Sequence, residues 1–542
     1  MVTLGIFSIW IRKIIPINPH FHLKHDDALM VNIAHSLISK NWLGDWNNLT
    51  LSKPPGYPFF LYISSFLNIS PLILIQILVL SSSFLMFFAL LNLNYSSKIA
   101  MLFFLILAFN PIFFGDEASR IYRDSFIGGL LLLIFSFGFW IFSKIISRNI
   151  KNIIFFSALT LTSFLFAILY LTKQDIVYWT FPLVLIIFVY LPLEYSKFKI
   201  KNRYILIPIC LAIWLFPHTL VNMAVKFKNN QIYGLSYVED YSSGPFAESL
   251  LLLSSLPGDL SLNYSPIDNV RKRLAYEISP SFQKLKRPLE VVQIGETNWS
   301  TISCQSSGIC QDAGPWTSWQ IRDAASIAIT KNDPKLYNQF FEILSNELLE
   351  YCKMTQKCSL KPISVQLHPV SIFEARRLID SFFKVTNSII KFDSAKTDRS
   401  LYFDVSDADL KLWLETIPGI EIYWESEINR YNKESINLSS FISFLKILYT
   451  FLFNVLILYL IFSFFFYSKI KKINFYLISL LTPFLHISLI AYVDSHGGVI
   501  GLARATYLLE SSPIFYAIIL SLALDVYFKN KKLPRKNFYE NE

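Results

Sequence analysis

The residues best suited to chemistry are an acidic pair near the start of the chain, Asp26 and Asp27. They precede the stretch Lys53-Pro54-Pro55-Gly56-Tyr57-Pro58, which leads into a long apolar segment. Moving a carboxylate out of water is costly. A chain as apolar as this one therefore tends to keep such acids only in a functional site or a solvated loop. A carboxylate can accept a proton from a nucleophile, and a nearby cation can neutralise a departing phosphate. The pair therefore predicts a group-transfer site at the edge of the apolar region.

The composition indicates a membrane protein. Of the 542 residues, 53% are hydrophobic and 16% are charged, which is too apolar for a soluble protein of this length. The net charge of +10 could suggest nucleic-acid binding, but Lys and Arg fall mainly in short runs between apolar segments. That placement fits the positive-inside rule, so no nucleic-acid partner is expected.

Several apolar runs reach the roughly 20 residues that a membrane-spanning helix needs. The predicted spans are 71–93, 125–143, 152–171, 204–222, 441–467, 473–492 and 508–528, with shorter candidates at 98–113 and 177–193. The segment from Pro58 to Leu67 is too short to span and predicts a juxtamembrane helix. The first seventeen residues predict either an unusually short span or the end of a longer one, in preference to a cleaved signal peptide.

Basic loops predict the orientation of these spans. The runs at 144–151, 197–203, 469–472 and 529–536 are rich in Lys and Arg and are expected on the cytoplasmic side of the plasma (inner) membrane. The remaining loops then lie outside, and they are 18–57, 114–124, 172–176, 223–440 and 493–507. This pattern predicts a multi-pass protein with one large extracytoplasmic insert.

Three blocks follow: an N-terminal membrane block at 1–222, a soluble insert at 223–440 and a C-terminal block of three spans at 441–542. Helical periodicity at 319–329, 336–353 and 368–392 predicts a mainly helical insert. Cysteine spacing favours disulfides Cys304–Cys310 and Cys352–Cys358 over a zinc site, because no histidine accompanies them at ligand spacing. Tryptophans of the insert could stack on sugar rings, although packing is the more common role; they are Trp299, Trp316 and Trp319.

The predicted outer loops gather polar groups on one side of the membrane. The second loop contains Asp116, Glu117, Arg120, Arg123 and Asp124; the third contains Lys173 and Asp175; the last contains Asp494, His496, Arg504 and Tyr507. Acids and cations together suit transfer from a phosphate-activated donor. Since nucleotide sugars are cytoplasmic, such a transferase acting outside requires a donor carried by a lipid.

At these positions the chain resembles the GT-C superfamily of polyprenyl-phosphate-sugar-dependent glycosyltransferases, which includes protein O-mannosyltransferases and aminoarabinose transferases. The resemblance covers residues 20–222 and 473–528 and excludes the insert. It rests on four places: Asp26-Asp27 with an Ala-rich helix after it, the stretch from Lys53 to Pro58, Arg120-Ile-Tyr-Arg123-Asp124-Ser, and Arg504-Ala-Thr-Tyr507 followed by Pro513. It implies an all-α transmembrane bundle of the GT-C type carrying the mainly helical insert.

The resemblance also implies roles for individual residues. Asp26, with Asp27 as its neighbour, would be the catalytic base or would orient the acceptor. The second-loop acid matches best at Asp124, and the alternatives in that loop are Asp116, Glu117, Arg120 and Arg123. Lys53 and Arg504 would contact the donor phosphate, with Lys173 as a further candidate, while Tyr57 and Tyr507 would contact substrate. Some members use a divalent cation and others do not, so a metal at Asp26 and Asp124 stays open.

The sequence thus predicts an integral membrane glycosyltransferase that moves a sugar from a polyprenyl-phosphate donor to a lipid, glycan or protein acceptor. Two alternatives use the same compartment: a transporter or flippase for a lipid-linked saccharide, and a polymerase or ligase of surface polysaccharide. A transporter should keep ionisable residues near the middle of its spans.

Overall fold

The computed structural model describes residues 1–21, 23–199, 203–258, 267–291, 299, 301, 303–304, 313–359, 375–395, 407–420, 425–466, 473–495 and 500–530. Within these ranges every regular element is a helix, and none is a strand. Extended pairing there is limited to a single bridge between Asn18 and Arg120. The prediction of an all-α chain is confirmed for this part.

Eight helices in the described part are long and apolar enough to cross a membrane. They are α4 (Pro71–Asn92), α6 (Arg123–Ile146), α7 (Asn152–Thr172), the continuous α8, η3 and α9 (Ile176–Leu185, Ile186–Tyr190 and Leu191–Lys199), α10 (Arg203–Tyr233), α19 (Glu425–Phe466), α20 (Ile473–Ser495) and α21 (Ile500–Asn530). These confirm the seven long spans predicted from the sequence and the candidate at 177–193. The candidate at 98–113 forms only a shorter helix, α5 (Ser97–Ala108), followed by η1 (Pro111–Phe113).

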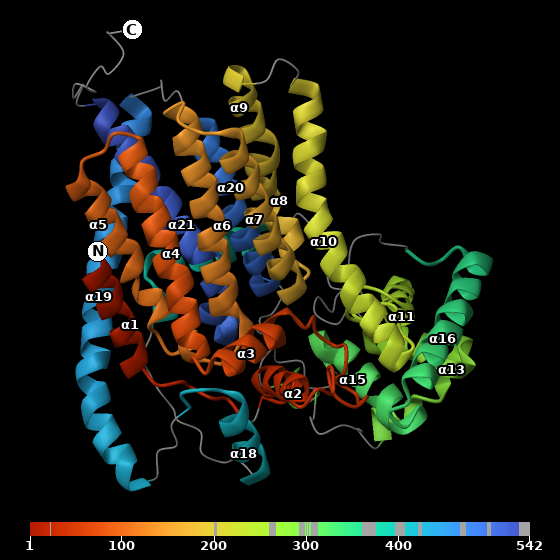
Figure 1. The fold of residues 1–542 in the computed structure, drawn as a ribbon. Coiled ribbons are helices and arrows are strands. Elements are labelled where there is room, and N and C mark those ends of the chain that lie inside the picture. The colour runs from red at the N-terminus through yellow and green to blue at the C-terminus, as the bar shows by residue number, and fades with distance from the viewer. Residues whose placement is uncertain are drawn as a thin grey trace.

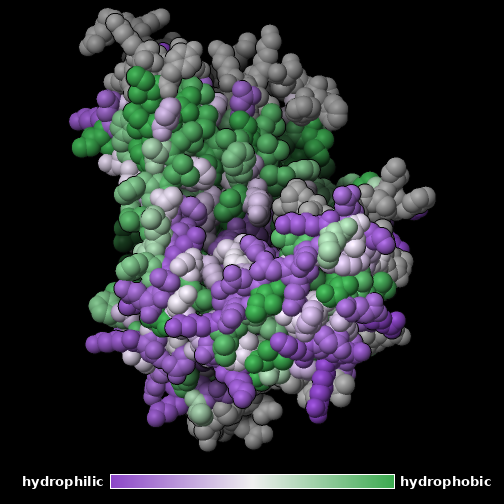
Figure 2. All heavy atoms as spheres, turned by 90° about the vertical axis from the view of Figure 1, so that its right-hand side faces the viewer, coloured by the Kyte–Doolittle hydropathy of each residue, from purple (hydrophilic) through white to green (hydrophobic). Residues whose placement is uncertain are grey.

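The helices divide the molecule into an apolar bundle and a polar end. In Figure 1 the turn between α6 and α7 lies at the upper end, while the insert lies at the lower end with α2 (Asp27–Ile38) and α3 (Gly56–Leu67). Figure 2 shows hydrophobic side chains gathered on the upper part and hydrophilic ones on the lower part. The chain is therefore a multi-pass membrane protein whose acidic pair and insert share one end of the bundle.

Helix α6 is the central element, because 89% of its most apolar window is buried by neighbouring helices. Its glycine at position 128 faces α21 so closely that a Cβ atom would overlap the carbonyl oxygen of Leu509. This contact brings the first turn of α6, with Asp124, beside Glu510 of α21.

The short helices α2 and α3 hold the first predicted site at the lower end of the bundle. Prolines at positions 54 and 55 precede α3, where a missing N–H costs nothing at a helix start. A Cβ atom on Gly56 would lie 2.6 Å from the carbonyl carbon of Leu171 at the end of α7. Close approach of α3 to α7 therefore requires glycine here, and it places the Lys53 stretch near Lys173.

The insert contains its own hydrophobic core. Its elements are α11 (Pro245–Ser255), α12 (Asn269–Ile278), α13 (Pro280–Gln283), η4 (Arg287–Val291), η5 (Gly314–Trp316), α15 (Thr317–Asp323), η6 (Ala324–Ile329) and α16 (Pro334–Thr355). Leu253, Phe341 and Leu344 are fully buried in this core. The disulfide between Cys352 and Cys358 is confirmed, whereas Cys310 lies outside the described residues, so its pairing with Cys304 stays a prediction.

Helices lie across both predicted limits of the insert, residues 223 and 440. Helix α10 continues past position 222 to Tyr233, so no helix end marks the start of the insert. Near the other end, α17 (Ala375–Ile390) and η7 (Asp393–Ala395) pack against the membrane bundle, whereas α18 (Asp407–Thr416) packs against α2 and α3. The ring of Phe392 stacks on Tyr516 of α21 at 4.2 Å. This segment was expected in the insert because it lies between the predicted spans; in the structure, α17 packs against α20 and α21.

Candidate functional site

The two adjacent acids have different partners and different exposure. Asp26 forms an ion pair with Lys53, and its side chain remains 40% exposed. Asp27 is fully buried and accepts two hydrogen bonds from Arg120, at 2.6 Å from Nη2 and 3.4 Å from Nε. Solvent and substrate can therefore reach Asp26, whereas Asp27 acts on the site through Arg120.

Tyr122 lies at the centre of the same group. Its hydroxyl donates to Asp26 Oδ1 at 3.1 Å and accepts from Lys53 Nζ at 3.2 Å. Three cations surround its ring: Lys53 Nζ at 5.1 Å from the centroid, and the guanidinium carbons of Arg120 and Arg123 at 5.3 and 5.4 Å. The sequence prediction omitted Tyr122, although it lies inside the motif from Arg120 to Asp124.

Helix α1 (Val2–Ile14) and the segment after it position the loop that supplies Arg120 and Arg123. Arg12 is buried and donates from Nη1 to the carbonyl of Phe113 at 2.9 Å and from Nη2 to Ser119 Oγ at 3.0 Å. The amide of Asn18 donates to the carbonyl of Ser119 at 2.9 Å. These three hydrogen bonds reach Phe113 and Ser119, and they fix the loop directly before Arg120.

Burial and charge shift the two carboxyl groups in opposite directions. Burial favours the neutral form of Asp26, but Lys53 and Arg120 more than offset this and lower its pKa to about 2. Burial raises the pKa of Asp27 to about 6, because Arg120 only partly offsets it and Asp26 opposes a second negative charge. In this arrangement Asp26 is a charged group that can hold a hydroxyl, and it becomes a better base only when Lys53 moves away from it.

Arg123 is the cation of this group that forms no ion pair within the part of the chain that the structure describes, although Asp124, Asp175 and Glu510 lie close enough to act on its charge. It is half-buried, and its Nε is buried with no hydrogen-bond partner among the described residues. Lys53 differs because it is paired, and burial lowers its pKa more than Asp26 raises it. A half-buried guanidinium with a buried, unpartnered N–H is suited to a phosphate or carboxylate ligand.

A second polar group lies where α7, α20 and α21 meet. Lys173 Nζ is 2.8 Å from Glu510 Oε1 and 3.4 Å from Asp175 Oδ2, and it lies 5.5 Å from the ring of Tyr507. Glu510 Oε2 is 3.3 Å from His486 Nε2. Glu510 was missed in the sequence, where the available signal was an acid within an apolar run.

The other predicted residues take several places. Asp124 is buried and lies close enough to Glu510 for the two carboxyl groups to interact electrostatically. It therefore belongs to the second polar group, with Lys173 and Glu510. Glu117 connects Arg120, at 3.5 Å, with the hydroxyl of Thr506 on α21. Tyr57 is completely buried against Phe60 and Phe126, with its hydroxyl unpartnered among the described residues.

Two predictions on this site remain untested. Arg504 lies in α21, whereas the sequence predicts a loop there. The side chain of Arg504 and the whole of His496 are outside the described residues. Asp116 is buried at the start of η2 (Glu117–Ser119). The described residues contain no group of three or more His, Cys, Asp or Glu side chains arranged to hold a metal ion.

The arrangement can bind an anion beside an exposed carboxylate at the polar end of a membrane bundle. The sequence motifs from the first and second loops come together in one group, and Lys173 with Tyr507 forms the adjacent one. Comparison with known proteins finds no matching family model, no matching curated protein and no matching solved structure.

Proposed function

We propose that this chain is an integral membrane glycosyltransferase that transfers a sugar from a polyprenyl-phosphate donor to an acceptor hydroxyl. The single observation that carries the proposal is the cluster of Lys53, Arg120 and Arg123 around Tyr122, beside the exposed Asp26. It lies at the end of an apolar bundle, where a lipid-linked substrate could keep its chain in hydrocarbon.

Charge changes in the reaction match this cluster. The acceptor oxygen attacks the anomeric carbon, and the bond from that carbon to the phosphate oxygen breaks with inversion. The phosphodiester donor carries one negative charge, and the departing polyprenyl phosphate carries one more. Cations that bind the departing group more strongly than the donor lower the barrier.

Asp26 and Lys53 would then act together. In the absence of donor, Lys53 neutralises Asp26 and keeps its pKa low. A donor phosphate that attracts Lys53 frees the carboxylate, whose basicity rises toward its ordinary value, so that it can take the proton of the acceptor hydroxyl. Arg123, which forms no ion pair with a described carboxylate and whose Nε has no hydrogen-bond partner among the described residues, would hold the phosphate from the start.

Orientation completes the proposal. The disulfide Cys352–Cys358 is typical of an oxidising compartment, which supports an extracytoplasmic insert and an active site at the outer face of the plasma membrane.

The test is a transfer assay on purified protein in liposomes. A panel of short-chain polyprenyl-phosphate sugars with a radiolabelled sugar is offered together with membrane extract as the source of acceptor. Wild-type protein should transfer label, and Asp26→Asn should lose at least about 100-fold in kcat, the scale of a lost general base. Unchanged turnover in a folded Asp26→Asn protein contradicts the assignment.

One observation favours the transporter as a second candidate. Glu510, His486 and Asp525 are buried inside spans, where ionisable groups often serve transport. Liposomes with a fluorescent polyprenyl-phosphate sugar separate the two functions, because a flippase changes the leaflet of the lipid without consuming the donor.

A further inference from the structure

The loop before α3 carries Lys53 and is unusual in its backbone. Asn47 Oδ1 accepts hydrogen bonds from the amides of Leu49 at 2.8 Å and Thr50 at 3.1 Å. Leu51 then adopts φ of 62°, in the left-handed region that side chains with a Cβ disfavour. A strained residue of this kind persists only where its surroundings hold it in place.

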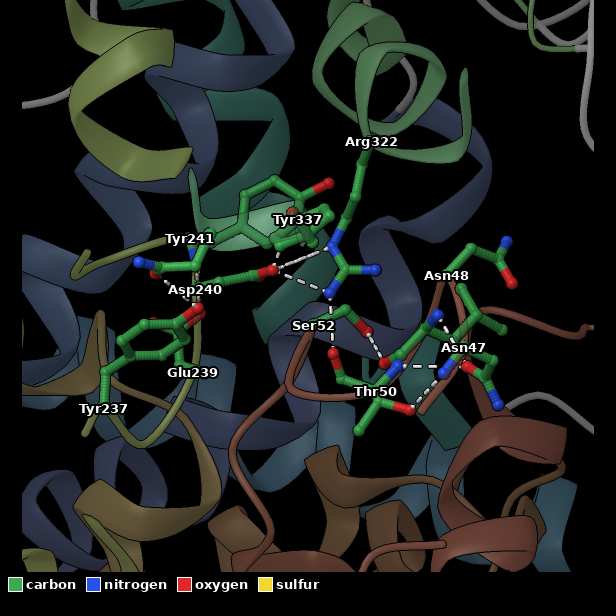
Figure 3. A network of polar contacts seen from close by, with 12 residues as sticks. Asn47, Asn48, Thr50, Ser52, Tyr237, Glu239, Asp240, Tyr241, Arg322 and Tyr337 are labelled. Atoms are coloured by element: carbon green, nitrogen blue, oxygen red, sulfur yellow. Dashed lines mark hydrogen bonds and ion pairs between the residues drawn. The ribbon is translucent and has the colours of Figure 1, made fainter. Parts of the chain in front are cut away.

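Arg322 of the insert supplies one such support, as Figure 3 shows. Its Nη2 donates to the carbonyl of Thr50 at 2.7 Å and to Asp240 Oδ2 at 2.7 Å, and its Nε donates to the same carboxylate at 3.1 Å. The amide of Asp240 donates to the carbonyl of Leu51 at 2.9 Å, and Tyr337 donates to Asp240 at 2.9 Å. The Arg322 and Asp240 side chains are fully buried.

Asp323, the next residue, supplies a second support. One carboxylate oxygen accepts from Asn48 Nδ2 at 2.9 Å, and the other accepts from Trp299 Nε1 at 2.9 Å. The ring of Trp299 packs edge-on against His25, with centroids 4.6 Å apart. His25 immediately precedes Asp26 in the chain.

We infer that Arg322 and Asp323 at the end of α15 are positioning residues that hold Lys53 and Asp26 in register for the reaction. Arg322 holds the backbone at Thr50, three residues before Lys53, and Asp323 joins the same loop, through Trp299, to His25, the residue before Asp26. That this relative position of Lys53 and Asp26 matters for a reaction rests on the proposed function. The insert then acts on the chemistry without touching substrate, by fixing both partners of the Asp26–Lys53 ion pair.

The choice of arginine supports this role. A guanidinium offers several donors in a rigid plane, so it can bind a carboxylate and a backbone carbonyl at the same time, whereas the ammonium of lysine has a single point of charge. A buried ion pair contributes little to stability by itself, because the loss of hydration offsets the attraction. The geometry of the Arg322–Asp240 pair is better explained by its effect on the loop before α3, which it holds in one position.

The test uses the full-length protein in detergent, with Arg322→Lys, Asp323→Asn and a control. Arg271→Lys is the matched control: Arg271 is also buried in the insert, also pairs with an aspartate, Asp268, and also donates to a carbonyl, that of Leu256. Among the residues that the structure describes, its hydrogen bonds reach Asp268 and Leu256 and none reaches the loop before α3. Two readouts need no activity: amide hydrogen exchange of residues 47–53, and the rate at which an amine-reactive reagent acylates Lys53.

Exchange at 47–53 and acylation of Lys53 should accelerate by roughly tenfold in Arg322→Lys and Asp323→Asn, as loss of a buried charged hydrogen bond predicts, and remain unchanged in Arg271→Lys. The inference is overturned if both loop readouts stay at wild-type values in variants whose insert remains folded. It is also overturned if Arg271→Lys changes them equally, since the effect would then be general destabilisation.

Turnover provides the second arm. Arg322→Lys should lower kcat in the wild-type background and have no further effect in Lys53→Ala, because it acts through Lys53. Additive losses would contradict positioning. If wild-type protein transfers no sugar at all, the proposed function fails, while exchange and acylation still decide whether α15 holds the loop.

Discussion

Asp26 and Asp27 are adjacent in sequence, yet the fold gives them separate tasks. The exposed Asp26 faces Lys53 and Tyr122, and the buried Asp27 holds Arg120 through two hydrogen bonds. At the residue scale, the site is an arrangement of cations around one tyrosine, with one acid reaching solvent and the other fixing an arginine. Single substitutions can therefore separate the role of Asp26 in the proposed reaction from the role of Asp27 in holding Arg120.

The pH dependence of stability is expected to reveal Asp27. Its pKa is raised from the ordinary value of 3.8 to about 6, so between these values the folded chain holds a proton that the unfolded chain releases. Raising the pH through this window thus lowers the free energy of unfolding, by about 3 kcal/mol at most. Asp27→Asn does not titrate, so it should gain stability relative to wild type between pH 4.5 and pH 7, as measured by thermal midpoints. A relative loss would contradict the shift.

Arg123 is expected to bind the donor phosphate. Arg123→Gln removes the cation that forms no ion pair among the described residues, so KM for the donor should rise by roughly tenfold or more, the cost of a lost charge-assisted contact. Lys144 lies in the last turn of the same helix, at the opposite end of the bundle, and Lys144→Gln is therefore the matched control. Equal effects of the two substitutions on KM would remove Arg123 from the donor site.

At the scale of elements, close helix contacts bring the polar groups together. Glycine permits α3 to reach the end of α7, and another glycine permits α6 to reach α21. These contacts join the Lys53 stretch to Lys173 and the first turn of α6 to Glu510. The site is consequently sensitive to changes that alter helix spacing without touching a charged side chain.

Gly56→Ala tests this dependence. The added Cβ would meet the backbone of Leu171 and Thr172 at 2.6 Å, so the helices must separate, at a cost of about 1–3 kcal/mol. Gly5→Ala is the control, because its Cβ would meet only Leu80 side-chain atoms at 3.9 Å. The buried free thiol of Cys210 reports unfolding when it reacts with a dye. The thermal midpoint should fall in Gly56→Ala alone, and a normal midpoint there would show that α3 and α7 tolerate separation.

Hydrophobic runs predicted the helices well, because a run of about 20 apolar residues is long enough to cross a membrane as a helix. Neighbours in space were harder to predict. An amphipathic helix such as α17 has an apolar face, but the sequence does not say whether that face covers the insert or the bundle. Glu510 was missed for a related reason, since its partners Lys173 and His486 come from other helices.

The acidic pair was found because the first and second loops each carry their polar residues close together in sequence. Their mutual geometry required the fold: Asp26 pairs with a lysine 27 positions away, and Asp27 with an arginine 93 positions away. The contacts made by the insert could be found only from the fold. Arg322 meets Thr50 across 272 positions, a distance over which no local pattern carries information.

For the whole molecule, the proposed reaction depends on which side of the membrane the polar end faces. The turn between α6 and α7 and the insert lie at opposite ends of the bundle, so a reagent that cannot cross the membrane should distinguish them. Asn149 in that turn and Lys331 in the insert are both exposed and suit single-cysteine labelling.

In intact spheroplasts of the expression host, a membrane-impermeant maleimide should label Lys331→Cys and spare Asn149→Cys until the membrane is opened. The expectation follows from the basic residues near the α6–α7 turn, which favour the cytoplasm, and from the disulfide of the insert, which favours an oxidising compartment. The reverse pattern would put Asp26 in the cytoplasm, where soluble nucleotide sugars are available, and a lipid-linked donor would no longer be required. Labelling of both positions before opening would contradict a bundle that spans the membrane.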